Sequence, residues 1–348
     1  MKRKLTLILA ITLIFSTATF LVPNLGMAED KPIVMKFGHS SDPSEDAWFH
    51  RYANKFKELM ETYSEGKITV EIYPSSQLGD EQEMFSSCSL GTLDATLGAA
   101  TNYVNYAPTM GFLTLPYIFE SAEQSRSVIS EMMPWLQEQS VSESNTRLIG
   151  ISDALFRELS TKQPVNSLED IKGMVIRVPS NPIMVACYEV WGAIPTVVAW
   201  TETYSALQQG VAVGQDNPYN ALISAKLYEV QKYVTDISYL IQANVFVLSE
   251  DFYQNLTPEL QAVVDRVGKE VVEFANKNTD DGTAQDKAKL EGLGITFLGI
   301  PVDKDKWIEL GRSVWPKFYE TLGKGDAEKG KLLIETVEKY KEQYNAGL

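Results

Sequence analysis

The sequence predicts an α/β protein of two lobes, each with a mixed or parallel β-sheet flanked by helices. Three observations lead to this prediction. Removal of an N-terminal leader leaves about 320 residues, which exceeds one comfortable hydrophobic core. Short apolar strands alternate with amphipathic helices, as is typical of parallel sheets covered on both faces. The alternation begins again near residue 146, which indicates a second unit of similar design.

The first 28 residues have the features of a secretory signal peptide. Three basic residues precede an uncharged run from Leu5 to Val22, and Gly26 and Ala28 supply the small residues of a cleavage site. The run is near the length that spans a bilayer, so an uncleaved anchor is the alternative. Pro23 and the cleavage site favour removal. No later segment is long and apolar enough to cross a membrane, so we expect an exported mature chain that does not insert into the bilayer.

The first unit follows the order strand, helix, strand, helix, strand. The first helix is predicted to begin at Asp42, an N-cap residue followed by Pro43 and, three residues after the cap, by Glu45. The second helix opens at Asp80 and runs through Cys88. Strands are predicted over residues 33–40, 68–74 and 93–97.

The second unit repeats this design, and a helical section follows it. Ser167 and Thr201 are predicted to cap its helices. Its strands are predicted over residues 146–153, 174–178 and 194–200. In the third section a helix begins at Thr257 and is expected to end near Asn276, before an acidic run at residues 278–282 that is interpreted as a solvated interruption. Further helices are predicted over residues 307–322 and 327–344.

Arg177 lies near the end of a strand that is apolar on both faces, Met174 to Val178. Such strands are usually buried under helices. A guanidinium does not lose its charge at physiological pH, so it must reach water or bind an anion. The strand therefore contains a candidate anion-binding residue.

Charge and composition exclude several classes of partner. Without the leader, 28 Lys and Arg remain against 46 Asp and Glu, a net charge of −18. Such a surface repels nucleic acids and anionic lipids, so an anionic ligand would need a local basic site. The two cysteines, Cys88 and Cys187, are interpreted as free, packed thiols, with a single disulfide between them as the alternative.

No catalytic or cofactor motif is evident. His39 and His50 are the only histidines, and their spacing does not form a helical metal-binding pair. HExxH, CxxC, GxSxG and Walker motifs are absent from the sequence. We therefore predict no catalytic residue, no metal and no cofactor. An exported hydrolase stays as an alternative, although no nucleophile and base can be named for it.

Several long segments resemble the dicarboxylate-type solute-binding proteins of TRAP transporters. They are GKITVEIYPSSQLGDEQEM, FRELSTKQPVNSLEDIKGMVIRVPSNP, WGAIPTVVAWTETYSALQQGVAVGQDNP and KLYEVQKYV, in matching order over the mature chain. The resemblance implies a two-lobed periplasmic-binding-protein fold with a hinge and long C-terminal helices. It implies lobe one at residues 31–154 plus 243–282, and lobe two at 155–242 plus 283–348.

The resemblance also suggests ligand-binding residues in the second lobe. In this family an arginine on the strand before Val-Pro forms a two-pronged salt bridge with the ligand carboxylate, and Arg177 matches it. Arg157 matches a second arginine, which either contacts the ligand or forms a structural salt bridge at the hinge. Asn217 matches an amide that binds the other carboxylate oxygen; the alternative is a turn before Pro218. Trp200 matches an aromatic residue against the ligand; the alternative is packing in the core.

Other predicted contacts lie where strands of the first lobe end, and one lies beside Arg177. Glu81 in particular suits a hydroxyl-bearing ligand, although each of these residues has a solvated loop as its alternative. The remaining predicted ligand contacts are Ser40, Asn102, Tyr103 and Ser180.

The resemblance therefore implies a periplasmic, non-enzymatic receptor. It would capture a small organic acid between two closing lobes and deliver it to the membrane permease subunits of a TRAP transporter. A sugar acid such as a uronate or aldonate is favoured, with a C4-dicarboxylate next. Besides the hydrolase, a ligand-binding partner of a sensory receptor is the alternative.

Overall fold

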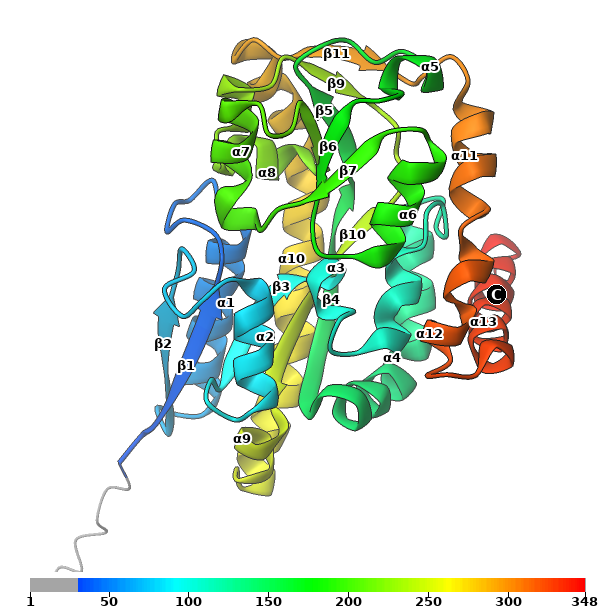
Figure 1. Cartoon of the computed structure of the whole chain (residues 1–348). Helices are drawn as coiled ribbons and strands as arrows, with labels where there is room; N and C mark the ends of the chain where they lie inside the picture. Colours follow the sequence, from blue (N-terminus) through cyan, green and yellow to red (C-terminus); the bar gives the residue numbers. More distant parts are fainter. Residues whose placement is uncertain (1–30, 348) are drawn as a thin grey trace, which may run out of the picture. The chain divides into compact units, whose positions relative to one another are not determined.

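The computed structural model describes residues 31–347, so the predicted signal peptide at residues 1–28 lies outside the described residues. Two mixed β-sheets organise this part of the chain (Figure 1). The first sheet has the strand order β2-β1-β3-β10-β4. Its strands are β1 (Ile33–His39), β2 (Ile68–Tyr73), β3 (Ala95–Ala99), β4 (Thr146–Phe156) and β10 (Ile241–Ser249).

The second sheet has the strand order β11-β9-β5-β8-β6-β7. Its members are β5 (Glu158–Thr161), β6 (Val175–Val178), β7 (Ile194–Val197), β8 (Gly214–Asn217), β9 (Tyr233–Thr235) and β11 (Thr296–Gly299). Strand β6 pairs in parallel with both β7 and β8, which places Arg177 inside the sheet, opposite Thr196 and Gln215. The predicted α/β architecture is confirmed.

The chain passes between the sheets at two adjacent places. Strand β4 ends at Phe156 in the first sheet, and β5 begins at Glu158 in the second. The return runs from β9 to β10, and Arg157 N–H donates to the carbonyl of Leu240 at 2.8 Å, which ties the two crossings together. These crossings lie close to the predicted lobe boundaries, and the full lobe division stays a prediction.

Helices cover both sheets. Those beside the first sheet are α1 (Trp48–Tyr63), α2 (Glu81–Ser89), α3 (Ala100–Tyr103), η1 (Pro108–Thr114), α4 (Ala122–Ser144) and α9 (Glu250–Gln254). Those that follow strands of the second sheet are α5 (Leu168–Ile171), α6 (Pro182–Val190), η2 (Trp200–Glu202), α7 (Thr203–Gln209), α8 (Tyr219–Ser224) and η3 (Leu227–Glu229).

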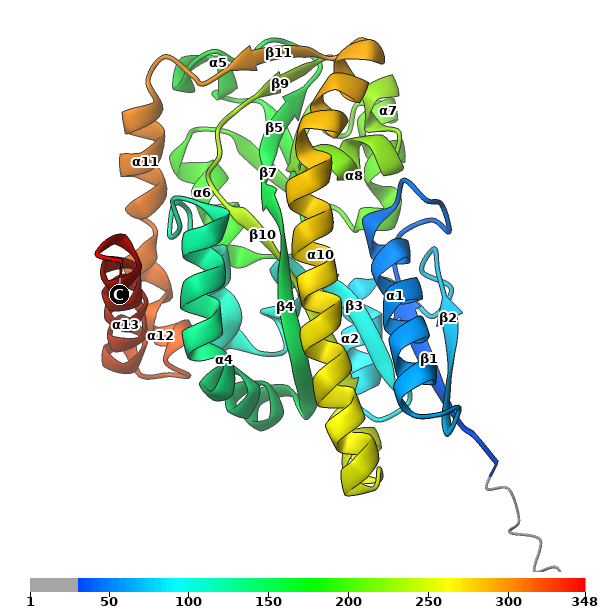
Figure 2. The ribbon, with the colours of Figure 1, turned by 180° about the vertical axis from the view of Figure 1, so that it is seen from behind.

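The long helix α10 (Pro258–Gly292) runs past both sheets, in contact with β4 and α1 at one part and with α8 at another (Figure 2). It does not end near Asn276, so the predicted interruption at residues 278–282 is wrong. The polar residues of that run take part in tertiary contacts instead. Thr279 Oγ1 donates to the carbonyl of Asp153 at 2.9 Å, and Asp280 pairs with Arg126 at 2.7 Å.

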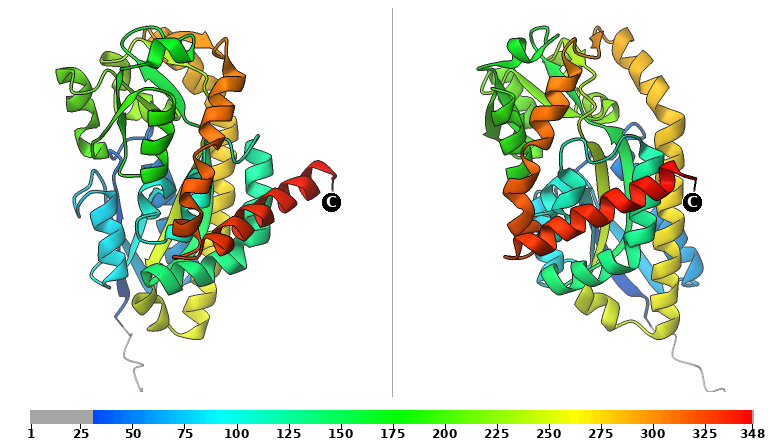
Figure 3. Two further views of the ribbon diagram at one scale, coloured as in Figure 1. Left: turned by 45° about the vertical axis from the view of Figure 1, so that its right-hand side comes forward. Right: turned by 90° about the vertical axis from the view of Figure 1, so that its right-hand side faces the viewer.

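The C-terminal helices follow β11 as α11 (Lys304–Arg312), η4 (Trp315–Phe318), α12 (Tyr319–Leu322) and α13 (Ala327–Asn345). Helix α13 crosses α4, a helix of the first sheet (Figure 3). Its Leu333 and Val337 share an apolar cluster with Val128 and Leu136 of α4. The expectation that residues 283–348 all accompany the second sheet therefore does not hold for α13, whose apolar face is buried on α4.

Helix α1 begins at Trp48 with Ala47 as its N-cap, five residues later than the predicted N-cap Asp42. The side chain of Asp42 accepts a hydrogen bond from Ser75 Oγ at 3.2 Å and caps no helix. Residues 40–47 therefore form a loop after β1. Cys88 and Cys187 are free and buried, as predicted. Among residues 31–347, no helix is both long and apolar enough to span a bilayer.

Candidate functional site

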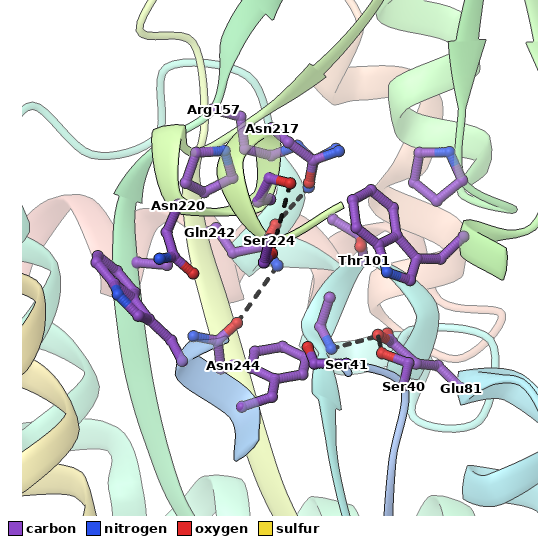
Figure 4. A pocket seen from close by; sticks show the side chains of 18 of the residues that line it. Ser40, Ser41, Glu81, Thr101, Arg157, Asn217, Asn220, Ser224, Gln242 and Asn244 are labelled. Carbon is purple, nitrogen blue, oxygen red and sulfur yellow. Dashed lines mark hydrogen bonds between the residues drawn. The ribbon is translucent and has the colours of Figure 1, made fainter. Parts of the chain in front are cut away.

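A polar pocket lies where the two sheets face each other, and residues of both sheets and of the crossing strands line it (Figure 4). Seven of the nine predicted ligand contacts are among its lining residues. They are Ser40, Glu81 and Asn102 from the side of the first sheet, Arg177, Trp200 and Asn217 from the second, and Arg157 from the crossing.

Arg177 is a buried cation without an anionic partner among residues 31–347. The whole residue is only 2% exposed. Its Nε donates to the carbonyl of Val198 at 2.9 Å, and its guanidinium carbon lies 5.8 Å from the centre of the Trp200 ring. Burial, and then the charge of Arg157, lower the pKa of Arg177 to about 10. A guanidinium that carries a positive charge at the wall of a pocket, with no carboxylate to neutralise it, is suited to an anionic ligand.

Arg157, in contrast, is fully paired. Its Nε donates to Asp216 Oδ2 at 2.6 Å, its Nη2 to the carbonyl of Asp216 at 2.5 Å, and its Nη1 to Gln242 Oε1. The hydroxyl of Tyr239 donates to the same Oδ2 of Asp216 at 2.7 Å. The sequence left two roles open for Arg157. In the structure this arginine forms a salt bridge that joins the crossing to β8.

Gln242 and Asn244 extend this network into the pocket (Figure 4). Gln242 Nε2 donates to Asn244 Oδ1 at 3.3 Å, while Gln242 Oε1 accepts from Arg157. Asn244 is fully buried, and its Nδ2 has no hydrogen-bond partner in the described part of the chain. Sequence analysis missed both residues. The signal was two polar residues, two positions apart, in the apolar run of β10, since such residues share one face of a strand.

Glu81 is the centre of a second hydrogen-bond network. Glu81 is the first residue of α2, and the capping box of Asp80 and Glu83 fixes the N-terminus of this helix. Glu81 Oε1 accepts from Ser40 Oγ at 2.6 Å. Its Oε2 accepts from Ala99 N–H at 3.0 Å and from Asn102 Nδ2 at 2.8 Å. The side chains of Ser40, Glu81 and Asn102 thus form one ordered group on the side of the first sheet.

The remaining second-sheet residues border the pocket in different ways. Asn217 Nδ2 donates to Gln215 Oε1 at 2.5 Å. Trp200 begins η2 and is partly exposed. Ser180 lines a neighbouring depression that also includes Arg177, Glu81 and Trp200, and its carbonyl accepts from Asn105 Nδ2 at 2.7 Å.

Tyr103 does not reach the pocket, so its predicted role is corrected. It is fully buried in the apolar cluster beside α4, and its hydroxyl lies 2.6 Å from Ser140 Oγ and 2.6 Å from Thr146 Oγ1. Asn102 and Tyr103 are consecutive residues of α3. Within α3, Thr101 and Asn102 line the pocket, whereas Tyr103 belongs to the apolar cluster.

Further lining residues complete the pocket. Helix α1 contributes two aromatic side chains, and α8 contributes polar ones. Polar and aromatic lining residues that sequence analysis did not select, besides Gln242 and Asn244, are Ser41, Trp48, Phe49, Thr101, Asn220 and Ser224. The loop before α1 and the short helix α8 approach each other only in the folded chain, where Asn220 Nδ2 donates to the carbonyl of Asp46 at 2.9 Å. Across residues 31–347, no group of three or more His, Cys, Asp or Glu side chains is arranged to hold a metal ion.

Comparison with known proteins identifies the family. The model of bacterial extracellular solute-binding proteins, family 7 (DctP), matches residues 37–322. A solute-binding protein of Roseobacter denitrificans is 31% identical over 269 residues, which are 77% of this chain and 82% of the relative. Its crystal structure, with bound L-galactonate, matches with a TM-score of 0.79 at 27% identity in the structural comparison, and the match covers 88% of this chain and 99% of that chain.

Two further relatives differ in the ligands that they bind. The C4-dicarboxylate-binding periplasmic protein of Rhodobacter capsulatus is 28% identical over 299 residues, which are 84% of this chain and 88% of the relative. A TRAP periplasmic solute-binding protein of Pseudomonas putida, solved with D-glucuronate, matches with a TM-score of 0.81 at 25% identity and covers 88% of this chain and 97% of that chain. The protein is therefore a member of family 7 of the bacterial extracellular solute-binding proteins, the DctP family of TRAP solute-binding proteins.

Proposed function

We propose that this protein captures a small organic acid in the periplasm and delivers it to the membrane permease subunits of a TRAP transporter. The single observation that supports this most is Arg177, a buried guanidinium at the pocket that no Asp or Glu among residues 31–347 neutralises. A planar guanidinium matches a carboxylate with two parallel hydrogen bonds. Residues 1–28 would direct export as a cleaved signal peptide.

The preferred ligand in this proposal is a sugar acid, such as a uronate or an aldonate. The pocket lining offers polar groups on several sides, among them Glu81, Asn102 and the unpaired amide donor of Asn244. Trp48, Phe49 and Trp200 supply apolar surface, against which the C–H faces of a sugar acid can pack. Two of the solved relatives contain L-galactonate and D-glucuronate. A C4-dicarboxylate, which the Rhodobacter capsulatus protein binds, is the next class.

A thermal-shift screen tests this function. L-Galactonate, D-glucuronate and succinate would be added separately to the wild type and to Arg177→Met. A ligand that binds only the native state at 100 times its Kd stabilises that state by about 2.7 kcal/mol. We expect a rise in Tm with at least one acid for the wild type and for the control Arg266→Met, whose arginine is exposed on α10. No rise for Arg177→Met is expected; a rise equal to that of the wild type would contradict the proposal.

Capture without turnover is the second part of the proposal. The bound acid should be recovered unchanged after prolonged incubation with a stoichiometric amount of protein, as monitored by NMR. Sustained formation of a product would instead support the exported hydrolase.

A further inference from the structure

The charged residues around the pocket leave one cation and one anion unneutralised. Only three of the lining residues carry a charge, namely Glu81, Arg157 and Arg177. The charge of Arg157 is neutralised by Asp216 at 2.6 Å, with both side chains buried. Glu81 and Arg177 form no ion pair with each other within the described chain, although both line the pocket and the neighbouring depression. A ligand therefore meets one available positive charge and one negative charge.

The carboxylate of Glu81 is held in place. Its residue is 7% exposed, and the three groups bonded to it come from the end of β1, the end of β3 and α3. If the side chain rotated away, the buried N–H of Ala99 would lose its partner, and an unpaired buried donor is unfavourable. Glu81 therefore cannot easily move aside for a second anion.

The hydrogen bonds leave one position on Glu81 for a ligand. An ionised carboxylate accepts at about four lone-pair positions and donates nothing. Oε2 already accepts from Ala99 N–H and Asn102 Nδ2, whereas Oε1 accepts only from Ser40 Oγ. The free position on Oε1 suits a hydroxyl donor and repels another carboxylate.

We propose that Glu81 selects monocarboxylates that carry hydroxyl groups and excludes dicarboxylates of similar size. This specificity rests on the proposed capture of organic acids. One carboxylate binds Arg177, and a hydroxyl of the same ligand donates to Glu81. A second carboxylate would be desolvated in the same pocket without a cation to pair with, next to the fixed negative charge of Glu81.

Matched pairs of acids test the proposal by isothermal titration calorimetry at pH 7.5. L-Galactonate is paired with galactarate, and D-gluconate with D-glucarate, because the members of each pair share an open carbon chain and differ only where the terminal CH2OH group of the first is a carboxylate in the second. We expect the wild type to prefer the monocarboxylate by at least about tenfold, since like charges in a desolvated site repel strongly. In Glu81→Gln the preference should shrink by about tenfold or reverse.

Two further variants serve as controls. One keeps the negative charge at position 81, and the other removes a negative charge elsewhere. Glu81→Asp keeps the negative charge and should keep a preference for the monocarboxylate, even if its affinity is lower. Glu202→Gln removes an exposed charge near Trp200 and should leave the preference unchanged. Melting curves check that each variant is folded.

The outcomes also separate this inference from the proposed function. If the wild type binds both members of a pair equally, or if folded Glu81→Gln keeps the full preference, the role of Glu81 is refuted while the capture of organic acids stands. If the wild type binds none of the four acids, the sugar-acid function itself is refuted, together with the selectivity that rests on it.

Discussion

Two arginines of one pocket have opposite environments. Arg157 has a carboxylate, a carbonyl and an amide oxygen around its guanidinium, whereas Arg177 donates to one carbonyl and faces Trp200. Desolvation of a charge is unfavourable unless a partner compensates for it. The unpaired residue is therefore the one that a bound carboxylate would stabilise most.

Arg177 provides the first test. Arg177→Lys keeps the charge but loses the planar pair of donors, so we expect it to bind nearly as poorly as Arg177→Met. Loss of one partner of a desolvated charge pair typically costs about 2–5 kcal/mol, or roughly thirty- to several-thousand-fold in affinity. Without ligand, Arg177→Met should melt at or above the wild type, because a buried unpaired cation is removed. Calorimetric affinity within a few-fold of the wild type would show that Arg177 is not the anchor.

Trp200 provides the second test. Its indole is partly exposed at the pocket and lies beside Arg177, so ligand binding should replace water next to the ring. We expect Trp200→Ala to lower affinity by about tenfold while its Tm stays within a few degrees of the wild type, since the residue is not fully buried. Tryptophan fluorescence and melting curves measure the two effects. A large fall in Tm with unchanged affinity would mean that Trp200 serves the apolar core.

At the scale of elements, the crossing between the sheets departs from regular strand geometry. Leu155 has a φ of 58°, in the left-handed region that non-glycine residues seldom adopt. Strands β4 and β10 also shift register between Ile241 and Ala243. We expect the hinge of the proposed closure at this place, because two irregular segments absorb a rotation more easily than a continuous ladder.

Glu158, the first residue of β5, lies at the same crossing. It is buried, and its two carboxyl oxygens accept from the N–H and the hydroxyl of Ser238, each at 2.8 Å. Burial raises the pKa of Glu158 from 4.5 to about 8. A raised pKa in the folded state means that the folded protein holds a proton that the unfolded chain releases. Its contribution to stability is present below about pH 4.5 and is lost as the pH rises towards 8.

The variant Glu158→Gln tests whether Glu158 makes the folded protein less stable as the pH rises. Its side chain has no proton to release, so the Tm of the variant should fall less than that of the wild type between pH 5 and 9, by roughly a few degrees. Differential scanning calorimetry across this range measures the difference. The exposed Glu202→Gln should keep the pH dependence of the wild type, and an equal slope for Glu158→Gln would mean that Glu158 is ionised in the folded protein.

For the described residues as a whole, most of the apolar core belongs to one sheet or the other. One large cluster packs α1 and α10 on the first sheet, and another packs α6 and Trp307 on the second. Polar contacts join the two sides at the pocket, such as the bond from Asn181 Nδ2 to the carbonyl of Thr101 at 3.1 Å. Cores that are mostly separate, joined by short crossings, allow relative motion more readily than one large shared core.

We therefore expect closure to depend on the ligand. Small-angle X-ray scattering should show a smaller radius of gyration for the wild type when a binding acid, identified by the thermal-shift screen, is saturating. Arg177→Met should show no change at the same concentration of acid. An unchanged radius for the wild type, with calorimetry confirming that the acid is bound, would contradict a hinged receptor.

Local sequence patterns determined much of this architecture. Strand and helix periodicity, together with capping residues, predicted the alternating order, the position of Arg177 on a buried strand and the helix that follows Asp80. These features depend on residues close together in the chain. Long matching segments also predicted the family, which the comparisons confirm.

The tertiary structure alone decided how distant residues are paired. Asp216, which lies 59 positions after Arg157, determines that this arginine is neutralised while Arg177 is not. The direction of Tyr103 depends on Ser140 and Thr146, and the continuity of α10 through its acidic run depends on contacts with Asp153 and Arg126. Such contacts leave no periodic signal in the sequence, because a polar side chain has the same local pattern whether it faces water or a partner brought close by folding.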